Sequence, residues 1–347
     1  ICFGMGYTWQ QGLAIVFISG LIFLAVSVSP IRKQIIDSIP APLKAAISAG
    51  IGLFICLIGL LNAGIVTAGN NLLDLSNITS GPALLALIGL IITGILMAWK
   101  VKGALFIGIL VTTVIGIPMG VTNLSNVNVS FEGISVAPTF FKLSFVGLLS
   151  KGILPLLTAI VTFAMCDCFD TVGTLIGTAG SAGMLDENGN LPRGDKALIA
   201  DAVATCTGAL MGTSTVTTFV ESSTGISEGA RTGLSSVVVG ILFLLGCVLA
   251  PIAGIIPSAA TAPALIIVGM FMIGNVAKID WSDVEVALPC FLTIAMMPFA
   301  YSISDGIGFG FISYTLIKMA RGKFKEVPVL LYILSALFVV MYILAAL

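Results

Sequence analysis

The sequence VTFAMCDCFDTVGTLIG occupies residues 161–177, and DAVATCTGALMGTSTVTTFVESSTGISEGAR occupies residues 201–231. Of the 31 charged residues in the chain, 11 lie between residues 161 and 231. An ionisable group at membrane depth costs about 2.5 to 3.5 kcal/mol on insertion scales. Acids embedded in apolar sequence therefore predict a substrate or ion site, and four are of this kind: Asp167, Asp170, Asp201 and Glu221.

The composition around this stretch is that of a polytopic membrane protein. Of the 347 residues, 58% are hydrophobic and 9% are charged, and a soluble domain with this composition would expose large apolar patches. A helix of about 20 residues crosses the hydrocarbon core. We predict a broken segment at 213–231 and eleven apolar spans, at 9–29, 42–61, 82–98, 103–121, 146–165, 197–212, 232–255, 261–277, 286–300, 307–319 and 327–347.

The basic residues predict the orientation of these spans. If the loop after the first span is cytoplasmic, alternation leaves only Lys142 and Lys151 outside, which is the positive-inside pattern. The net charge of -1 gives no indication of nucleic-acid binding. The other 13 of the 15 basic residues are expected inside: Arg32, Lys33, Lys44, Lys100, Lys102, Arg193, Lys196, Arg231, Lys278, Lys318, Arg321, Lys323 and Lys325.

The polar chemistry of the chain comes from carboxylates and hydroxyls. There is no histidine, and the seven cysteines lack metal-ligand spacing, so we expect buried small side chains rather than a metal or cofactor site. An intramembrane enzyme would need a nucleophile–base pair or metal ligands, and the chain has neither an HExxH motif nor a histidine that could serve as the base. We therefore do not expect an enzyme.

Asp167 and Asp170 are three residues apart, so on a helix they share a face and are expected to point into the same cavity or interface. Two carboxylates this close resist simultaneous ionisation, which suits a proton carrier. The alternative is a helix cap or a hydrogen bond to neighbouring Ser and Thr residues. Gly173 and Gly177 follow with the spacing that lets another backbone approach closely.

The polar, β-branched segment 213–220 predicts extended backbone that leads into a half-helix beginning near Glu221. Unwound backbone at membrane depth is tolerated where it is buried in protein or lines a cavity, and half-helix N-termini point at ligands. We therefore expect Glu221 to bind a ligand, and a capping role for its carboxylate is compatible with this. For Asp201, a structural role near the inner surface remains equally open.

Two stretches of the sequence, one in each half of the chain, resemble each other. IPAPLKAAISAGIGLFICLIGLLNAGIV at 39–66 resembles IPSAATAPALIIVGMFMIGNVAKID at 256–280. By the charge bias one copy starts inside and the other outside, as in inverted-repeat transporters. In the C-terminal half, ISDGIGFGF at 303–311 predicts close helix packing through small residues.

Three motifs carry a family resemblance: DCFDTVGTLIG at 167–177, LPRGDKALIADAVAT at 191–205 and GTSTVTTFVESSTGISEGARTGL at 212–234. They strongly resemble the adenine, guanine and hypoxanthine permeases, the AzgA-like branch of the nucleobase-ascorbate transporter superfamily. FGMGYTWQQGLAIVFISG at 3–20 resembles the end of the third transmembrane segment and the fourth. The chain is therefore expected to be truncated at its N-terminus.

The resemblance implies an all-α membrane protein with a seven-plus-seven inverted repeat and a short extended segment in a broken helix. It places parts of a core domain at 1–29 and 146–256 and parts of a gate domain at 30–121 and 257–347. It implies import of guanine, hypoxanthine or adenine by proton symport across a bacterial inner or plasma membrane. The runner-up is an anion transporter or channel of the same fold, which the carboxylates disfavour.

By residue-to-residue matching, Asp167 and Asp170 correspond to the acidic pair of the family's eighth segment. Asp201 corresponds to the ninth-segment aspartate and Glu221 to the substrate-binding acid of the tenth. Proton coupling is expected at Asp167, Asp170 and Asp201. The partners implied are a purine nucleobase, a proton and the lipid bilayer, with a homodimer allowed and with no cofactor, metal or nucleic acid. The expected substrate-binding residues are Asp167, Asp170, Thr215, Phe219, Val220 and Glu221.

Overall fold

A computed structural model describes the chain at residues 6–29, 38–69, 72–79, 81–123, 135, 137–181, 183–186, 191–219, 221–227 and 229–346. These ranges do not include Val220, Arg32 or Lys33, so what was predicted for these three residues stays a prediction. The chain forms two compact units. The first contains Ile1–Ile51, Ser135–Val220 and Met272–Leu347, and the second contains Gly52–Ile134 and Glu221–Phe271.

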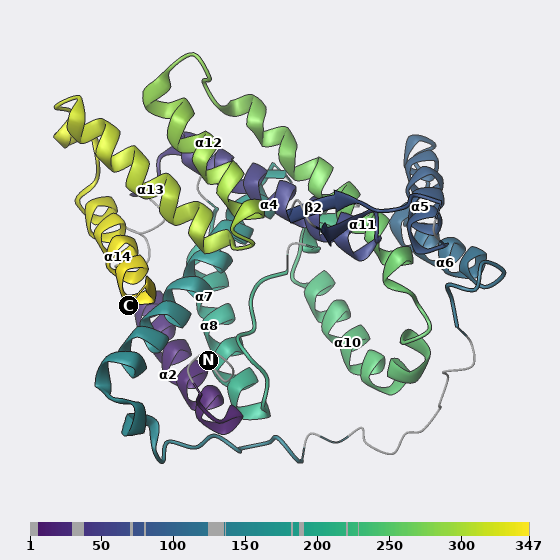
Figure 1. Ribbon diagram of the computed structural model, residues 1–347, viewed down its shortest axis with the longest axis horizontal. Helices are drawn as coiled ribbons and strands as arrows, with labels where there is room; N and C mark the ends of the chain where they lie inside the picture. The colour runs from purple at the N-terminus through teal and green to yellow at the C-terminus, as the bar shows by residue number, and fades with distance from the viewer. Residues whose placement is uncertain are drawn as a thin grey trace. The chain divides into compact units, whose positions relative to one another are not determined.

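Each of the eleven predicted spans overlaps an α-helix in the structure (Figure 1). A further helix, α9 (Ser222–Ser227), is short and lies within the predicted broken segment. Among the residues that the structure describes, five helices are long and apolar enough to cross a membrane: Trp9–Val28, Ala41–Asn62, Gly81–Ala98, Pro155–Gly180 and Ser258–Lys278. The apolar helices are α2 (Trp9–Val28), α4 (Ala41–Asn62), α5 (Gly81–Ala98), α6 (Ala104–Gly116), α7 (Ile153–Ser181), α8 (Gly194–Met211), α10 (Leu234–Ala253), α11 (Ser258–Ile273), α12 (Val284–Phe299), α13 (Ile303–Ala320) and α14 (Val329–Ala346).

The predicted boundaries of the fifth span, 146–165, are wrong. Helix α7 begins at Ile153 and runs for 29 residues to Ser181. Gly147 and Gly152 both have positive φ and enclose a short 3-10 turn, η1 (Leu148–Lys151), which delays the start of the helix. The acidic pair therefore lies in the middle of a long helix rather than just beyond the end of a span.

The prediction of an all-α fold is also wrong in one place. Strands β1 (Val66–Gly69) and β2 (Leu72–Leu75) form an antiparallel pair in which Val66 is opposite Leu75 and Gly69 is opposite Leu72. Between two helices, backbone N–H and C=O groups have no intrahelical partners, and a hairpin satisfies them. The first strand follows directly on an apolar stretch that includes the buried residues Ala63 and Ile65. No charged residue or proline in the sequence marks where the strand begins.

Helices α12 and α13 pack closely in the first unit (Figure 1). A Cβ added to Gly306 would lie 2.8 Å from the carbonyl oxygen of Thr293, so α13 approaches the backbone of α12 at this glycine. The close packing predicted for 303–311 is thus confirmed. Helix α13 also contacts α14 and α7, and the rings of Phe169, Phe311 and Phe338 lie together with centroids 5.2 to 6.2 Å apart.

The close approach predicted at Gly173 and Gly177 is confirmed. A Cβ on Gly177 would lie 2.7 Å from Met272 Cε and 3.6 Å from Ser48 Cα, and one on Gly173 would lie 3.2 Å from Ile47 Cγ2. Helix α7 therefore packs through its glycines against α4 and against Met272 in the last turn of α11. Helix α2 covers α7 and α8, so both acid-bearing helices contact the same neighbour (Figure 1).

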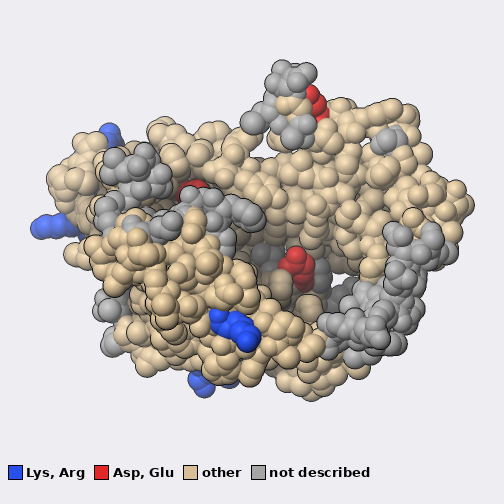
Figure 2. Space-filling model, turned by 60° about the horizontal axis from the view of Figure 1, so that its bottom comes forward, with Lys and Arg blue, Asp and Glu red and all other residues tan. Residues whose placement is uncertain are grey.

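In the second unit, α5 and α6 form a hairpin in which threonines meet glycines. A Cβ on Gly89 would lie 2.6 Å from Thr112 Oγ1, and Gly108 faces Thr93 in the same way. Unlike the α5–α6 hairpin, helix α10 has few close contacts among the described residues, and its large apolar side chains from Leu234 to Leu245 are mostly exposed. Among the described residues visible in Figure 2, most of the surface is uncharged, with charged side chains in only a few isolated places. Such surfaces suit contact with lipid.

Candidate functional site

The centre of the site is a set of crossed hydrogen bonds between α7 and α8. Each helix carries an aspartate followed four residues later by a threonine, so the two side chains lie one turn apart on the same face. Thr171 of α7 donates to Asp201 Oδ2 of α8 at 2.6 Å, and Thr205 Oγ1 of α8 lies at hydrogen-bond distance, 3.0 Å, from Asp167 Oδ2 of α7. The two helices are therefore linked twice, each time through a carboxylate.

All four of these side chains are buried. Thr171 and Thr205 have no exposed surface, and Asp167 and Asp201 are 2% and 7% exposed. A buried polar group is stable only when it is hydrogen-bonded, and a buried charge requires more partners still. The threonines thus serve as hydrogen-bond partners to acids that would otherwise lie in apolar surroundings.

The third component of the site is the segment 213–219, which forms neither helix nor strand. Helix α8 ends at Met211 and is capped by Gly212, whose φ of 99° is accessible to glycine, and the Thr213 N–H then donates to Gly208 O at 3.0 Å. A Cβ on Gly208 would lie 2.5 Å from Val216 Cγ2, so the chain turns back along α8.

This segment completes the hydrogen bonding of the acids. Thr218 Oγ1 donates to Asp201 Oδ1 at 2.9 Å, and the Thr218 backbone N–H donates to the same carboxylate. Thr205 Oγ1 also lies 3.0 Å from the carbonyl oxygen of Val216. The prediction that the chain breaks its helix after 212 is confirmed, because α8 stops at Met211 and α9 begins at Ser222.

Asp170 belongs to a different contact. Its Oδ1 accepts from Ser304 Oγ of α13 at 2.9 Å. The expectation that Asp167 and Asp170 point into one interface is wrong with respect to their hydrogen-bond partners, since Asp167 faces α8 and Asp170 faces α13. Three residues along a helix leave two side chains about 60° apart, and on a helix packed between two neighbours this separation is enough to select different partners.

The remaining predicted ligands lie in or beyond the non-helical segment. Thr215 is half-buried, and the Phe219 side chain is 57% exposed. Glu221 directly precedes α9, as predicted, and its side chain is exposed. The structure thus groups Asp167 and Asp201 with three threonines that the sequence reasoning had not singled out. The signal was present, because Asp-x-x-x-Thr occurs both at 167–171 and at 201–205.

A family model described as "Permease family" matches residues 1–309 of the chain. The chain belongs to this family. As a permease it is a transporter rather than an enzyme, and it is a multi-pass protein of the cell membrane.

Curated relatives confirm the narrower resemblance to purine permeases. Guanine/hypoxanthine permease PbuG of Bacillus subtilis is 45% identical over 337 residues, which cover 97% of this chain and 76% of PbuG. Adenine permease AdeP of Escherichia coli is 39% identical over 338 residues, covering 96% of this chain and 74% of AdeP. Guanine/hypoxanthine permease PbuO of Bacillus subtilis is 41% identical over 340 residues, covering 96% of this chain and 77% of PbuO.

Among solved structures, the transmembrane domain of the cyanobacterial bicarbonate transporter BicA resembles the permease in fold. The TM-score is 0.60 at 18% sequence identity, and the match covers 86% of this chain and 76% of the BicA domain. At this identity the likeness concerns fold alone. It shows that the helix arrangement is a transporter architecture.

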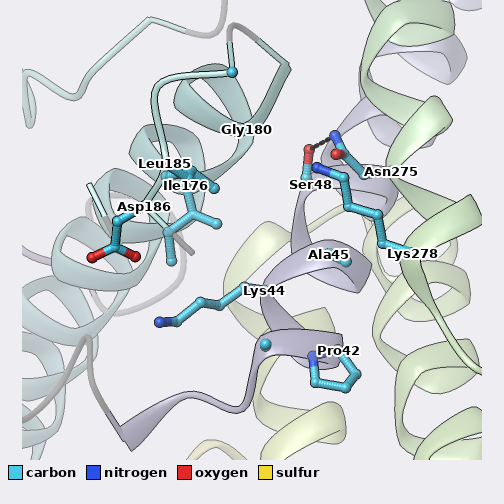
Figure 3. Close-up of a pocket in the computed structure, with 12 residues that line it drawn as sticks. Pro42, Lys44, Ala45, Ser48, Ile176, Gly180, Leu185, Asp186, Asn275 and Lys278 are labelled. Atoms are coloured by element: carbon cyan, nitrogen blue, oxygen red, sulfur yellow. Dashed lines mark hydrogen bonds between the residues drawn. The ribbon is translucent and has the colours of Figure 1, made fainter. Parts of the chain in front are cut away.

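The permease also has a cavity of about 330 Å³ within the first unit, shown in Figure 3. Across it, Asn275 Nδ2 donates to Ser48 Oγ at 2.8 Å and joins η2 (Gly274–Lys278) to α4. Lys44 and Lys278 both line the cavity, and the charge bias assigns both to the cytoplasmic side. The cavity is lined by Ala41, Pro42, Lys44, Ala45, Ser48, Ile176, Gly180, Gly183, Leu185, Asp186, Asn275 and Lys278.

Proposed function

We propose that this permease imports purine nucleobases, and that it does so by proton symport. The observation that carries the proposal is a buried carboxylate network beside a non-helical segment, in a chain whose relatives are named guanine/hypoxanthine and adenine permeases. A purine presents N–H donors and ring-nitrogen acceptors along its edge. Carboxylates and free backbone groups complement such an edge.

In this proposal the substrate is bound at the broken segment. Glu221 accepts from the purine N–H groups, and the backbone around Thr215, Phe219 and Val220 pairs with the remaining polar atoms. Glu221 directly precedes α9, and its side chain is exposed. Carboxylates would repel an anionic cargo, which argues against an anion transporter of the same fold.

Proton coupling is assigned to the buried acids, because the chain has no histidine. Asp167 and Asp201 lie between α7 and α8, and Asp170 lies against α13. The proposed division into core (1–29, 146–256) and gate (30–121, 257–347) would let α7 and α8 move against the gate helices. Two related halves of opposite orientation would make that movement alternate between the two sides of the membrane.

The test is to measure purine binding by purified variants together with uptake into liposomes under an imposed proton gradient, with and without sodium. Glu221→Gln is expected to abolish binding, since an amide loses one acceptor and gains a donor. Asp167→Asn is expected to retain binding but to weaken gradient-driven accumulation. Unchanged purine affinity in Glu221→Gln would contradict the substrate assignment. Full proton-driven accumulation in both Asp167→Asn and Asp170→Asn would contradict the coupling assignment.

A further inference from the structure

We infer that Thr205 is a positioning residue that links the proton on Asp167 to the seating of residues 213–219 against α8. The inference deepens the proposed function and rests on it for its role in transport. The physical link itself comes from a count of hydrogens at one hydroxyl group.

A threonine hydroxyl has a single hydrogen to donate. Thr205 Oγ1 lies 3.0 Å from Asp167 Oδ2 and 3.0 Å from Val216 O. If Asp167 is ionised, both of these atoms are pure acceptors, so the hydroxyl can satisfy only one of them. Both contacts are hydrogen bonds only when Asp167 Oδ2 carries a proton and donates it to Thr205, which then donates to Val216.

The second oxygen of Asp167 supports the protonated form. Asp167 Oδ1 is buried and has no hydrogen-bond partner among the described residues. Asp201 contrasts with it, because it accepts from Thr171 and from both the hydroxyl and the backbone N–H of Thr218. A buried carboxylate with several donors can remain an anion, whereas one with a single shared donor cannot do so without cost. The structure therefore places the proton on Asp167 and the charge on Asp201.

The surroundings supply no compensating cation. Helix α2, which packs on α7 and α8, has no ionisable side chain along its length. Among the described residues, no lysine or arginine is recorded against Asp167, and the titratable groups that face it are Asp170, Cys166 and Cys168 of α7 and Asp201 and Cys206 of α8.

Loss of the proton then has a structural consequence. The Thr205 hydrogen turns to Asp167 Oδ2, and the Val216 carbonyl loses its donor. Val216 sits against Gly208 at the point where the chain turns back along α8, so this carbonyl helps to hold the segment in place. Proton release and release of the segment are thus coupled, and the coupling is reciprocal: displacing the segment changes the affinity of Asp167 for its proton.

Hydrogen exchange of the purified protein, followed by mass spectrometry at mildly acidic and at alkaline pH, tests the inference without any substrate. Exchange in residues 213–219, relative to the intrinsic chemical rate at each pH, is expected to rise about fivefold at alkaline pH, the effect of losing one hydrogen bond. Thr205→Ser keeps the hydroxyl and should behave like the wild type. Thr207→Val, an exposed site on the same helix, should do so too.

Two variants should abolish the pH response in opposite ways. The Asp167→Asn amide donates to Thr205 at every pH, so exchange should stay low, whereas Thr205→Val cannot hold Val216, so exchange should stay high. A wild-type pH response in Asp167→Asn, or no response in the wild type, would overturn the inference. Asp167→Asn and Thr205→Ser carry the test if Thr205→Val does not fold. Because no purine is present, failure of the proposed transport would not alter these results.

Discussion

At the scale of single residues, the permease shows how neighbouring hydroxyls give similar acids different roles. Asp167 and Asp201 occupy matching positions on facing helices, each four residues before a threonine. Asp201 receives additional donors from Thr218, whereas the one hydroxyl that contacts Asp167, that of Thr205, also contacts a backbone carbonyl. The number of donors distinguishes the two acids, although their burial is nearly the same.

Thr171→Val should destabilise the protein, because it removes a fully buried donor to Asp201 at 2.6 Å and leaves that acceptor oxygen without it. A loss of about 1 to 3 kcal/mol is expected from the free energy of unfolding. Thermal unfolding in detergent measures the effect. Thr207→Val provides the matched control, since the Thr207 hydroxyl bonds only to carbonyls of its own helix at an exposed position. Equal stability of the two variants would contradict a structural role for Thr171.

At the scale of helices, small residues determine which pairs pack closely. Gly306 of α13 lies against the backbone of α12, and Gly177 of α7 lies against Met272 and Ser48. In lipid, helices associate through close packing because there is little hydrophobic drive between them. The glycines of this chain are therefore informative about helix neighbours, in contrast to its uniformly apolar spans.

Gly306→Ala should lower the melting temperature by several degrees, since the new Cβ would meet Thr293 O at 2.8 Å and the Met297 side chain, and α12 and α13 would have to move apart. Gly240→Ala on α10 is the control, because no atom lies within 4 Å of the added Cβ and alanine favours the helix. The two variants should shift the melting temperature in opposite directions. A stabilising Gly306→Ala would disprove the packing argument.

A second feature of the α12–α13 pair is an ion cluster at one end. Glu285 accepts from Lys318 at 3.0 Å, Arg321 at 2.7 Å and Lys323 at 2.8 Å, and only 10% of its side chain is exposed. Glu326 also pairs with Lys318 but is 52% exposed. The start of α12 and the end of α13 are thus held together by one carboxylate among three cations.

Glu285→Gln should lower the melting temperature more than Glu326→Gln, because it leaves three cations without their shared anion. The Lys318 ammonium holds the pKa of Glu326 below its ordinary value of 4.5. The contribution of the Glu326–Lys318 pair to stability is therefore fully present above pH 4.5, and it is lost as the pH falls through the lowered pKa of Glu326. Melting temperatures of both variants across this range test the ranking, and a larger effect of Glu326→Gln would reverse it.

At the scale of the whole molecule, the distribution of charge predicts the topology. Thirteen of the 15 basic residues are expected on the cytoplasmic side. Lys44 and Lys278 line one cavity although 234 residues of sequence separate them, which agrees with their assignment to the same side. The Glu285 cluster likewise gathers three basic residues at one place.

Single cysteines placed at Lys100, Arg193 and Lys323 in a cysteine-free background should all resist an impermeant thiol reagent added to intact cells. They should react after the membrane is opened. A cysteine at Lys142 provides the control, because it is expected outside and should be labelled in intact cells. Labelling of any of the first three positions from outside would contradict the orientation.

The sequence by itself determined the class of protein, its helices and its family. Apolar spans of the right length are local properties, so each of the eleven predicted spans was found as a helix, and the break after residue 212 was found where glycine and β-branched residues indicated it. The motifs at 167–177, 191–205 and 212–234 were specific enough to identify purine permease relatives. Acids in apolar sequence marked the site, because their burial is costly wherever the helices lie.

Only the tertiary structure decided which partner each acid has. Sequence spacing placed Asp167 and Asp170 on one helix face, but the neighbours of α7 assign them to α8 and α13. The crossed bonds to Thr171 and Thr205 depend on the register between two helices, which no local pattern encodes. The short hairpin at 66–75 was missed because each of its strands is only four residues long, too short for a clear alternating pattern. Hydrogen bonds across elements depend on packing, and packing is set by the whole fold.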